Sequence, residues 1–280
     1  MTMFDQARRF APSAVAAVAT VLMGVAGAQA DSRLDARYRM SVAGIAIGSS
    51  EISVVIVGSD YTAAGSGRAS GLLRVLATGE GIVTARGAIV DGRPVPASFT
   101  SSTAGDDETA EARMTLANGD VTELHAEASD AGVARVPVTA EHRKGIIDPL
   151  SALLVPVADG EPIAASACEH TLAIFDGRRR YDLALAFKRI DKVKTAKGYA
   201  GAAVVCAVAF TAIAGHRPDS ALVKYLAGGR DVELTLAPIT GTRLLAPFRL
   251  SIANMLGNIV IEATAFDTAV TPPAAKAGSE

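Results

Sequence analysis

Short runs in which apolar and polar residues alternate dominate the chain between residues 31 and 270. In the first run, Tyr38, Met40 and Val42 are separated by charged or polar residues. Further alternating runs begin at Ile52, Ile82, Val95, Glu111, Val121, Tyr181, Val204, Val232, Phe248 and Ile259. Alternation with a period of two is typical of strands that bury one face in an antiparallel sheet. The pattern therefore predicts a mostly β protein.

Pairs of turn-forming residues separate several of these runs. Asp91-Gly92 and Asn118-Gly119 each predict a tight hairpin turn, because such pairs tolerate the left-handed backbone that these turns require. Asp176-Gly177 predicts a further turn of the chain. Two glycine-rich stretches, Gly44–Gly48 and Gly65–Gly71, are interpreted as turns. The second stretch resembles a phosphate-binding loop only superficially, because it lacks the Gly-Lys-Ser/Thr ending and the strand–loop–helix setting.

The chain also contains segments with helical spacing of apolar residues. In the segment that begins Asp148-Pro149, leucines recur at helical spacing up to residue 154, with Asp148 as N-cap and Pro149 at the first helical position. Asp219 can cap a second short helix over residues 221–226. A third is plausible near residues 68–78. The sequence thus predicts two or three short helices beside the sheet.

The two cysteines of the chain, Cys168 and Cys206, constrain the shape of this sheet. Between them the sequence predicts a hairpin, a basic connection at Lys188–Lys197 and a third strand. In a flat meander the first and third strands lie about 9.6 Å apart, whereas a disulfide tolerates Cα separations only up to about 6.8 Å. Either Cys168 lies in the loop that enters the hairpin, or the sheet coils. Both alternatives favour a strongly curved antiparallel sheet, an open barrel or β-spiral.

The first thirty residues have the features of a secretory signal peptide. Arg8 and Arg9 precede a run of small apolar residues, and Ala28-Gln29-Ala30 is a small-x-small cleavage site. An N-terminal membrane anchor is the alternative, but the abundance of Ala and Gly and the cleavage site favour removal after Ala30. We expect export by the general secretion route, a single β-rich domain over residues 31–270 and a disordered tail over 271–280.

Export bears on the chemistry of the cysteines. In an oxidising compartment Cys168 and Cys206 most simply form a structural disulfide, since reactive pairs are usually close in sequence, as in C-x-x-C. The four histidines have no metal-ligand spacing, and no nucleophile motif is complete. These histidines are His125, His142, His170 and His216. We therefore predict a non-enzymatic protein without a metal or cofactor.

Charge and composition narrow the classes of partner. A formal net charge of −2 provides no electrostatic surface for nucleic acid, and no later stretch has the roughly 18 apolar residues of a membrane span. Arg178–Arg180 could bind a phosphorylated headgroup or an acidic partner, although a solvated hairpin tip is favoured. The absence of tryptophan weakens a carbohydrate-binding hypothesis. Because the inward faces are Leu, Val, Ile and Phe, a cavity would favour an apolar ligand such as an acyl chain.

Several motifs together resemble a known family. They are Gly44-Ile-Ala-Ile-Gly48, Asp148-Pro149-Leu-Ser151, Cys168, Phe175-Asp-Gly-Arg178 and Cys206. This succession is similar to a family of secreted proteobacterial proteins catalogued as a domain of unknown function. The resemblance implies a periplasmic location and supplies no catalytic residues.

Two functions are compatible with these observations. The first is a non-enzymatic periplasmic protein that supports cell-envelope integrity by binding a protein partner or an envelope component. The alternative is a carrier or binder of a lipid or lipidated ligand inside the curved sheet. An enzyme acting on an envelope polymer would need a polar cleft with convergent carboxylates, which no motif in the sequence indicates.

Overall fold

The computed structural model describes most of the chain after residue 30. The described stretches are residues 31–69, 79–105, 109–128, 132–157, 162–229, 231–253 and 257–271. The predicted signal peptide lies outside them, as do residues 70–78 of the third predicted helix and residues 272–280 of the predicted tail.

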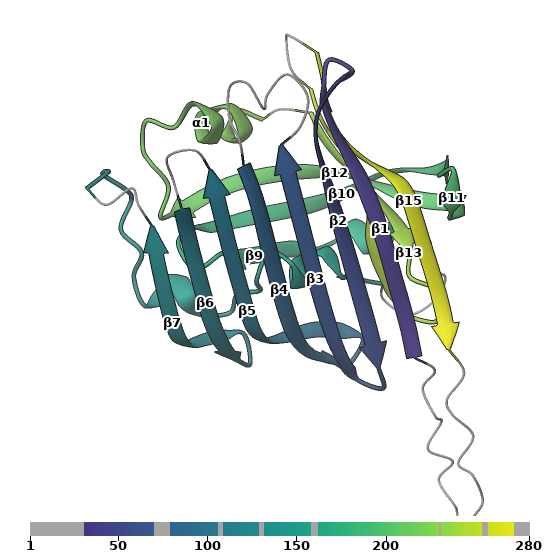
Figure 1. Cartoon of the computed structure of the whole chain (residues 1–280), viewed down its shortest axis with the longest axis horizontal. Helices are drawn as coiled ribbons and strands as arrows, with labels where there is room; N and C mark the ends of the chain where they lie inside the picture. The colour runs from purple at the N-terminus through teal and green to yellow at the C-terminus, as the bar shows by residue number, and fades with distance from the viewer. Residues whose placement is uncertain are drawn as a thin grey trace, which may run out of the picture.

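The described residues form fifteen strands that belong to one sheet (Figure 1). The first seven are β1 (Asp31–Val42), β2 (Ile45–Val57), β3 (Asp60–Ala69), β4 (Gly79–Val90), β5 (Arg93–Gly105), β6 (Thr109–Ala117) and β7 (Asp120–Ala128). The others are β8 (Val155–Pro156), β9 (Thr171–Phe175), β10 (Arg180–Lys194), β11 (Lys197–Gly198), β12 (Ala200–Ala214), β13 (Val232–Pro238), β14 (Leu244–Ile252) and β15 (Ile259–Thr271). The prediction of a mostly β protein with a large antiparallel sheet is confirmed, although β11 and β15 pair in parallel.

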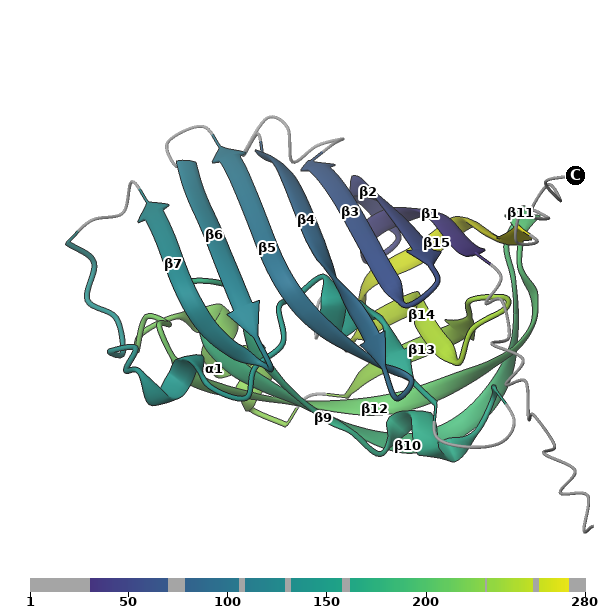
Figure 2. The same cartoon turned by 90° about the horizontal axis from the view of Figure 1, so that it is seen from below.

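The order of the strands divides the sheet into two halves. Strands β7 to β1 follow one another in reverse sequence order, and the sheet continues as β15-β14-β13-β12-β10-β9. Strand β1 joins the halves, because it pairs with β15 from Asp31↔Thr271 to Val42↔Ile259. In Figure 2 the strands β9, β10 and β12 run below the row from β2 to β7, with other elements between them.

The sheet is not closed by strand pairing, since β7 and β9 form its two ends. A short segment, Gly145–Ile147, connects these ends. The Ile146 N–H donates to the Gly119 carbonyl beside β7 at 2.7 Å, and the Ile147 N–H donates to the Ala173 carbonyl of β9 at 2.9 Å. The gap between β7 and β9 is therefore bridged at one end by backbone hydrogen bonds from a segment that is not itself a strand of the sheet.

The glycine-rich stretches are not the turns that the sequence predicted. Residues 65–69 continue β3, where Gly65 pairs with Ile52 of β2 and with Val83 of β4. Neighbouring strands on both sides satisfy the backbone, so the glycines need no turn. The other turn is confined to Ala43 and Gly44, both with positive φ, and β2 begins at Ile45.

The predicted short helix over residues 221–226 is confirmed, but the other helices differ from the prediction. The described residues contain one α-helix, α1 (Ala221–Ala227), and three 3₁₀ helices, η2 (Glu141–Arg143), η3 (Ser151–Leu153) and η4 (Ala165–Cys168). None of them has the length and apolar character needed to cross a bilayer. Ser220 caps α1, because its side chain accepts a hydrogen bond from the Val223 N–H. Asp219, the predicted cap, instead pairs with Arg217 at 3.3 Å.

The disulfide between Cys168 and Cys206 is present, with a Cα–Cα distance of 5.4 Å. Cys168 ends η4 and precedes β9, so the first alternative from the sequence holds. Because η4 contacts both β10 and β12, Cys168 reaches across β10 to Cys206. Both cysteines are completely buried in a small core with Leu185 and Val204.

Strand β10 is longer than expected, because most of the predicted basic connection, Lys188–Lys194, forms nearly half of it. Residues up to Lys194 pair with β12. Arg189 donates two hydrogen bonds to the Glu233 carboxylate of β13, at 3.0 and 2.8 Å, and Lys188 lies 2.6 Å from the same carboxylate. Hydrogen bonds from Arg189 and Lys188 lower the pKa of Glu233 from 4.5 to about 2. This cluster links β10 to β13 across β12.

A glutamine at position 233 should remove the charged part of this link. Because the cluster is partly exposed, Glu233→Gln is expected to cost at most about 1 kcal/mol at pH 7. A lowered pKa stabilises the folded state above pH 4.5, and that contribution disappears as the pH falls towards 2. Urea unfolding of both proteins across this range should show the difference shrinking with acidification, and a constant difference would contradict this.

Candidate functional site: an apolar hollow inside the sheet

Small residues gather on the inner face of β2, β3 and β4, the face that carries the buried side chains. In β3 this face contains Tyr61 and Ala63, both buried, followed by Gly65 and Gly67. Their inward neighbours include Ser50 of β2 and Gly81 of β4, because side chains alternate between the two faces of a strand. The absence of large side chains leaves a hollow of about 340 Å³ at this point.

Apolar side chains from two parts of the chain surround the hollow. Strands β2, β4 and β5 contribute Ile52, Val83 and Phe99, and the segment around η3 contributes the opposite wall. The residues of that wall are Pro149, Leu150 and Leu153. Glu51 also borders the hollow, but it is an outward position of β2 and its carboxylate lies 3.3 Å from Arg37. The volume is at the lower end of the range of ligand pockets, about 300–1,000 Å³.

The space beside Gly67 is open, whereas the space beside Gly65 is not. A Cβ atom at Gly65 would lie 3.0 Å from Val83 Cγ2 and 3.7 Å from Leu150 Cδ1. At Gly67 the nearest atoms would be Ser50 Cβ at 3.6 Å and the Ser49 carbonyl oxygen at 3.8 Å. A side chain added at Gly67 therefore enters the hollow without a close contact at its Cβ.

A buried polar cluster holds the wall formed by the η3 segment. Asp148 Oδ1 accepts hydrogen bonds from the backbone N–H groups of Leu150 and Ser151, at 3.0 and 2.9 Å. The Tyr61 hydroxyl and Ser151 Oγ lie 2.6 Å apart, which connects the wall to β3. Asp148 thus accepts capping-type hydrogen bonds, but the predicted α-helix is absent: the segment forms the 3₁₀ helix η3, and its N-cap position is Leu150.

Burial dominates the electrostatics of this cluster. It raises the pKa of Asp148, and it raises the pKa of Tyr61 well above its usual value. Asp148 Oδ2 has no hydrogen-bond partner among the described residues. Asp148 and Ser151 are completely buried and Tyr61 nearly so, which leaves no surface for a substrate. The cluster is therefore a structural support of the hollow.

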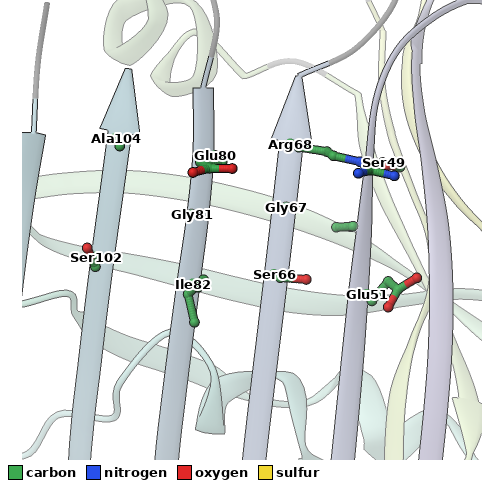
Figure 3. A pocket seen from close by; sticks show the side chains of 11 residues that line it. Ser49, Glu51, Ser66, Gly67, Arg68, Glu80, Gly81, Ile82, Ser102 and Ala104 are labelled. Carbon is green, nitrogen blue, oxygen red and sulfur yellow. The ribbon is translucent and has the colours of Figure 1, made fainter. Parts of the chain in front are cut away.

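The opposite face of the same strands carries mainly polar side chains near this position. Figure 3 shows this outer groove of about 380 Å³, where Ser49, Ser66, Arg68 and Glu80 lie on β2, β3 and β4. Arg68 and Glu80 are register partners in neighbouring strands. At this position the sheet has glycine backbone on its inner face, and on its outer face polar side chains together with the exposed Ile82.

His170 and the Arg178–Arg180 cluster, which the sequence suggested as candidate chemical groups, do not line the hollow. His170 is held by Pro156, whose carbonyl lies 3.1 Å from its Nε2. At the β9–β10 turn, Asp176 accepts hydrogen bonds from the Arg178 and Arg179 backbones, and the Arg180 side chain pairs with Asp182. Within the described stretches, no group of three or more His, Cys, Asp or Glu residues could hold a metal ion.

The floor of the hollow was missed because its glycines were interpreted as a turn. The useful signal was their spacing. Gly65 and Gly67 stand two residues apart, which places both on one face of a strand. Glycine inside a strand pattern marks a close approach of another group or a missing side chain.

Taken together, the fold and the hollow define a β-sheet protein with an apolar hollow on the inner face of its sheet. The chain belongs to DUF3108, a protein family of unknown function, whose model matches residues 37–264. The predicted membership of such a family is thereby confirmed.

Comparison with solved structures found a similar chain of low sequence identity. The chain is similar to the crystal structure of a beta-barrel-like protein of the domain of unknown function DUF1849 from Brucella abortus. The two share 10% sequence identity with a TM-score of 0.44, over 86% of this chain and 98% of the other. No curated protein matches the chain.

Proposed function

We propose that the protein is a non-enzymatic periplasmic binding protein that holds an apolar group, such as the acyl chain of a lipid or lipidated ligand, in the hollow. The observation that carries this proposal is the apolar space between the glycine floor of β2–β4 and the wall Pro149–Leu153. The ligand would lie within the curved sheet, which we interpret as an open barrel.

The lining of the hollow supports an apolar ligand over a polar one. Its walls are mainly aliphatic or aromatic, with Ser50 and Ser66 as polar neutral residues, and the one carboxylate at its border points outward and is paired with Arg37. Each methylene group that leaves water contributes about 0.8 kcal/mol. Apolar contacts alone can therefore stabilise a bound alkyl chain, by an amount that increases with the number of methylene groups that leave water.

The proposed ligand also connects the two functions predicted from the sequence. A protein exported to the periplasm meets lipids and lipidated proteins as components of the cell envelope. Sequestering or presenting such a group is one way of supporting envelope integrity through binding. We therefore retain this role as the setting of the proposed activity.

Filling the hollow should abolish binding without unfolding the protein. Gly67→Val places a branched side chain in the open space, and valine is compatible with a strand. We expect it to weaken binding of the fluorescent fatty acid cis-parinaric acid by at least about tenfold, or 1.4 kcal/mol. Thr62→Val, at an exposed position of the same strand, is the matched control and should leave affinity unchanged.

Native mass spectrometry of protein purified from envelope extracts provides a second measurement. We expect the wild type to retain a lipid or lipidated molecule, and Gly67→Val to lose it. Equal affinity of both valine variants for the probe would contradict the proposal. So would the absence of both probe binding and a co-purifying lipid in the wild type.

A further inference from the structure

Strand β10 has an unpaired edge in its second half. It pairs with β12 from Arg180 to Lys194 on one side, but β9 pairs with it only up to residue 184 on the other. The Leu185 N–H, which donates to the His170 carbonyl at 2.8 Å, is the last such hydrogen bond on that side. From Ala186 to Lys194, this edge pairs with no described residue. Figure 2 shows β10 along the lower margin of the molecule.

Two large apolar side chains are exposed beside the unpaired edge. Phe187 is 44% exposed and Ile190 is 51% exposed. Their register partners in β12 are Cys206 and Val204, which share one core, so Phe187 and Ile190 lie on the same face of β10. A register shift between Phe187 and Arg189 accounts for the uneven spacing of this pair. An edge with exposed apolar residues is a template for pairing with another chain.

The end of the same edge is basic. Lys192 and Lys194 follow Ile190 at alternate positions and so share its face. Neither lysine forms an ion pair with a described residue, whereas Lys188 and Arg189 are engaged by Glu233. The edge therefore offers an apolar half at Phe187–Ile190 and a basic half at Lys192–Lys194.

The charges argue against a second copy of the chain as the occupant. In an antiparallel pairing of two copies centred on Ile190, Lys192 of one copy would face Lys188 of the other. Like charges directly opposite each other across two strands are destabilising. A strand with carboxylates at the corresponding positions would be stabilised instead.

We propose that the β10 edge, Ala186–Lys194, is a docking site that receives an extended segment of a partner protein by strand addition. Backbone hydrogen bonds to the open edge would provide affinity, and alternate side chains would provide specificity. The segment would place apolar side chains beside Phe187 and Ile190 and carboxylates beside Lys192 and Lys194. This inference goes beyond the proposed function, because the edge contributes no residue to the hollow.

The β10 edge is held in an extended conformation before any partner arrives. Its other side is paired with β12 at every residue except Lys188, where the register shifts, and the two hydrogen bonds from Arg189 to Glu233 fix it to β13. A preformed strand avoids the entropic cost of ordering on the receptor side.

Three labelled nine-residue peptides test the proposal by fluorescence anisotropy with the whole protein. The first has the sequence Thr-Val-Thr-Val-Thr-Glu-Thr-Glu-Thr. The second carries lysine in place of glutamate, and the third carries proline in place of alternate threonines, so that it keeps the charge but cannot pair. We expect the first to bind at least about tenfold more tightly than either of the others.

Variants of the edge complete the test. Lys192→Glu/Lys194→Glu should lose the acidic peptide and gain the lysine peptide, and Ile190→Lys should weaken the acidic peptide. Arg86→Glu/Arg113→Glu, at exposed positions of β4 and β6, is the matched control for net charge and should change nothing.

Four outcomes would overturn the proposal. The first is that the proline peptide binds as tightly as the acidic peptide, and the second is that Arg86→Glu/Arg113→Glu changes binding as much as Lys192→Glu/Lys194→Glu does. The third is that no peptide binds. The fourth is that the protein forms dimers that Ile190→Lys abolishes while no peptide binds. The last outcome, measured by light scattering, would assign the edge to a second copy. Loss of fatty-acid binding in Gly67→Val affects none of these readouts, so the two proposals fail separately.

Discussion

Removal of the disulfide is expected to lower the free energy of unfolding by about 4 kcal/mol, whichever cysteine is replaced. Cys168 and Cys206 are 38 residues apart, and the bond between them restricts the unfolded chain. Alanine is the suitable replacement at both positions, because the sulfurs lie in a dry core where a serine hydroxyl would lack a partner. Cys168→Ala and Cys206→Ala should have equal effects, since each breaks the same bond.

The double variant shows whether the bond itself carries this effect. Urea unfolding of the two single variants, the double variant and the reduced wild type should give nearly the same loss. Additive effects in the double variant would indicate that packing of each side chain matters more than the bond. A difference of more than about 1 kcal/mol between the free energies of unfolding of the two single variants would also indicate that side-chain packing matters more than the bond. The cost of a cavity depends on the site at which it forms.

The second large effect is expected at Asp148, whose carboxylate holds the wall of the hollow. Asp148→Ala removes the acceptor of two buried backbone N–H groups and should cost about 3 kcal/mol. Asp148→Asn keeps a side-chain oxygen in the same place and removes only the charge. We therefore expect the asparagine variant to fold with nearly wild-type stability.

The pH dependence of stability distinguishes the effect of the Asp148 hydrogen bonds from the effect of its negative charge. Burial raises the pKa of Asp148, so the folded state retains a proton that the unfolded state has already released. The stabilising contribution of the protonated form is thus lost as the pH rises from the ordinary carboxyl range through the raised pKa. The stability of Asp148→Asn relative to wild type should increase over this range, in urea unfolding at several pH values. A difference that is independent of pH, or an asparagine variant as unstable as alanine, would refute this account.

Local features of the fold could be predicted from the sequence. Asp91 and Asn118 adopt the positive φ that a two-residue turn requires, and the strands on each side pair directly from Val90↔Arg93 and Ala117↔Asp120. Such turns depend on a few neighbouring residues, so the sequence pattern identifies them. The disulfide could also be predicted from the sequence, because two cysteines allow only one pairing within the chain.

Features that depend on distant neighbours could not be predicted in this way. Gly65–Ala69 forms a strand because β2 and β4 pair with it on both sides, and an isolated reading of its glycines favours a turn. Lys188–Lys194 forms a strand because β12 continues beside it. In both cases tertiary pairing overrides the local propensity.

The hollow could not be predicted from the sequence for the same reason. The sequence predicted apolar inward faces, but the space exists only where Gly67 of β3 meets Leu150 and Leu153. These residues come from segments about eighty positions apart, and no local pattern relates them. What the sequence did provide was the capping by Asp148, which positions the wall.

The pairing of the first described strand with the last has a consequence for the order in which the protein can fold. Strands β2 to β7 follow one another along the chain, so each can pair with its predecessor soon after it becomes available. Strand β1 must wait for β15, across more than two hundred residues, and such distant pairings slow folding. Until β15 arrives, one whole edge of β1 is open to other chains. During synthesis this is the interval in which the protein most needs protection from aggregation.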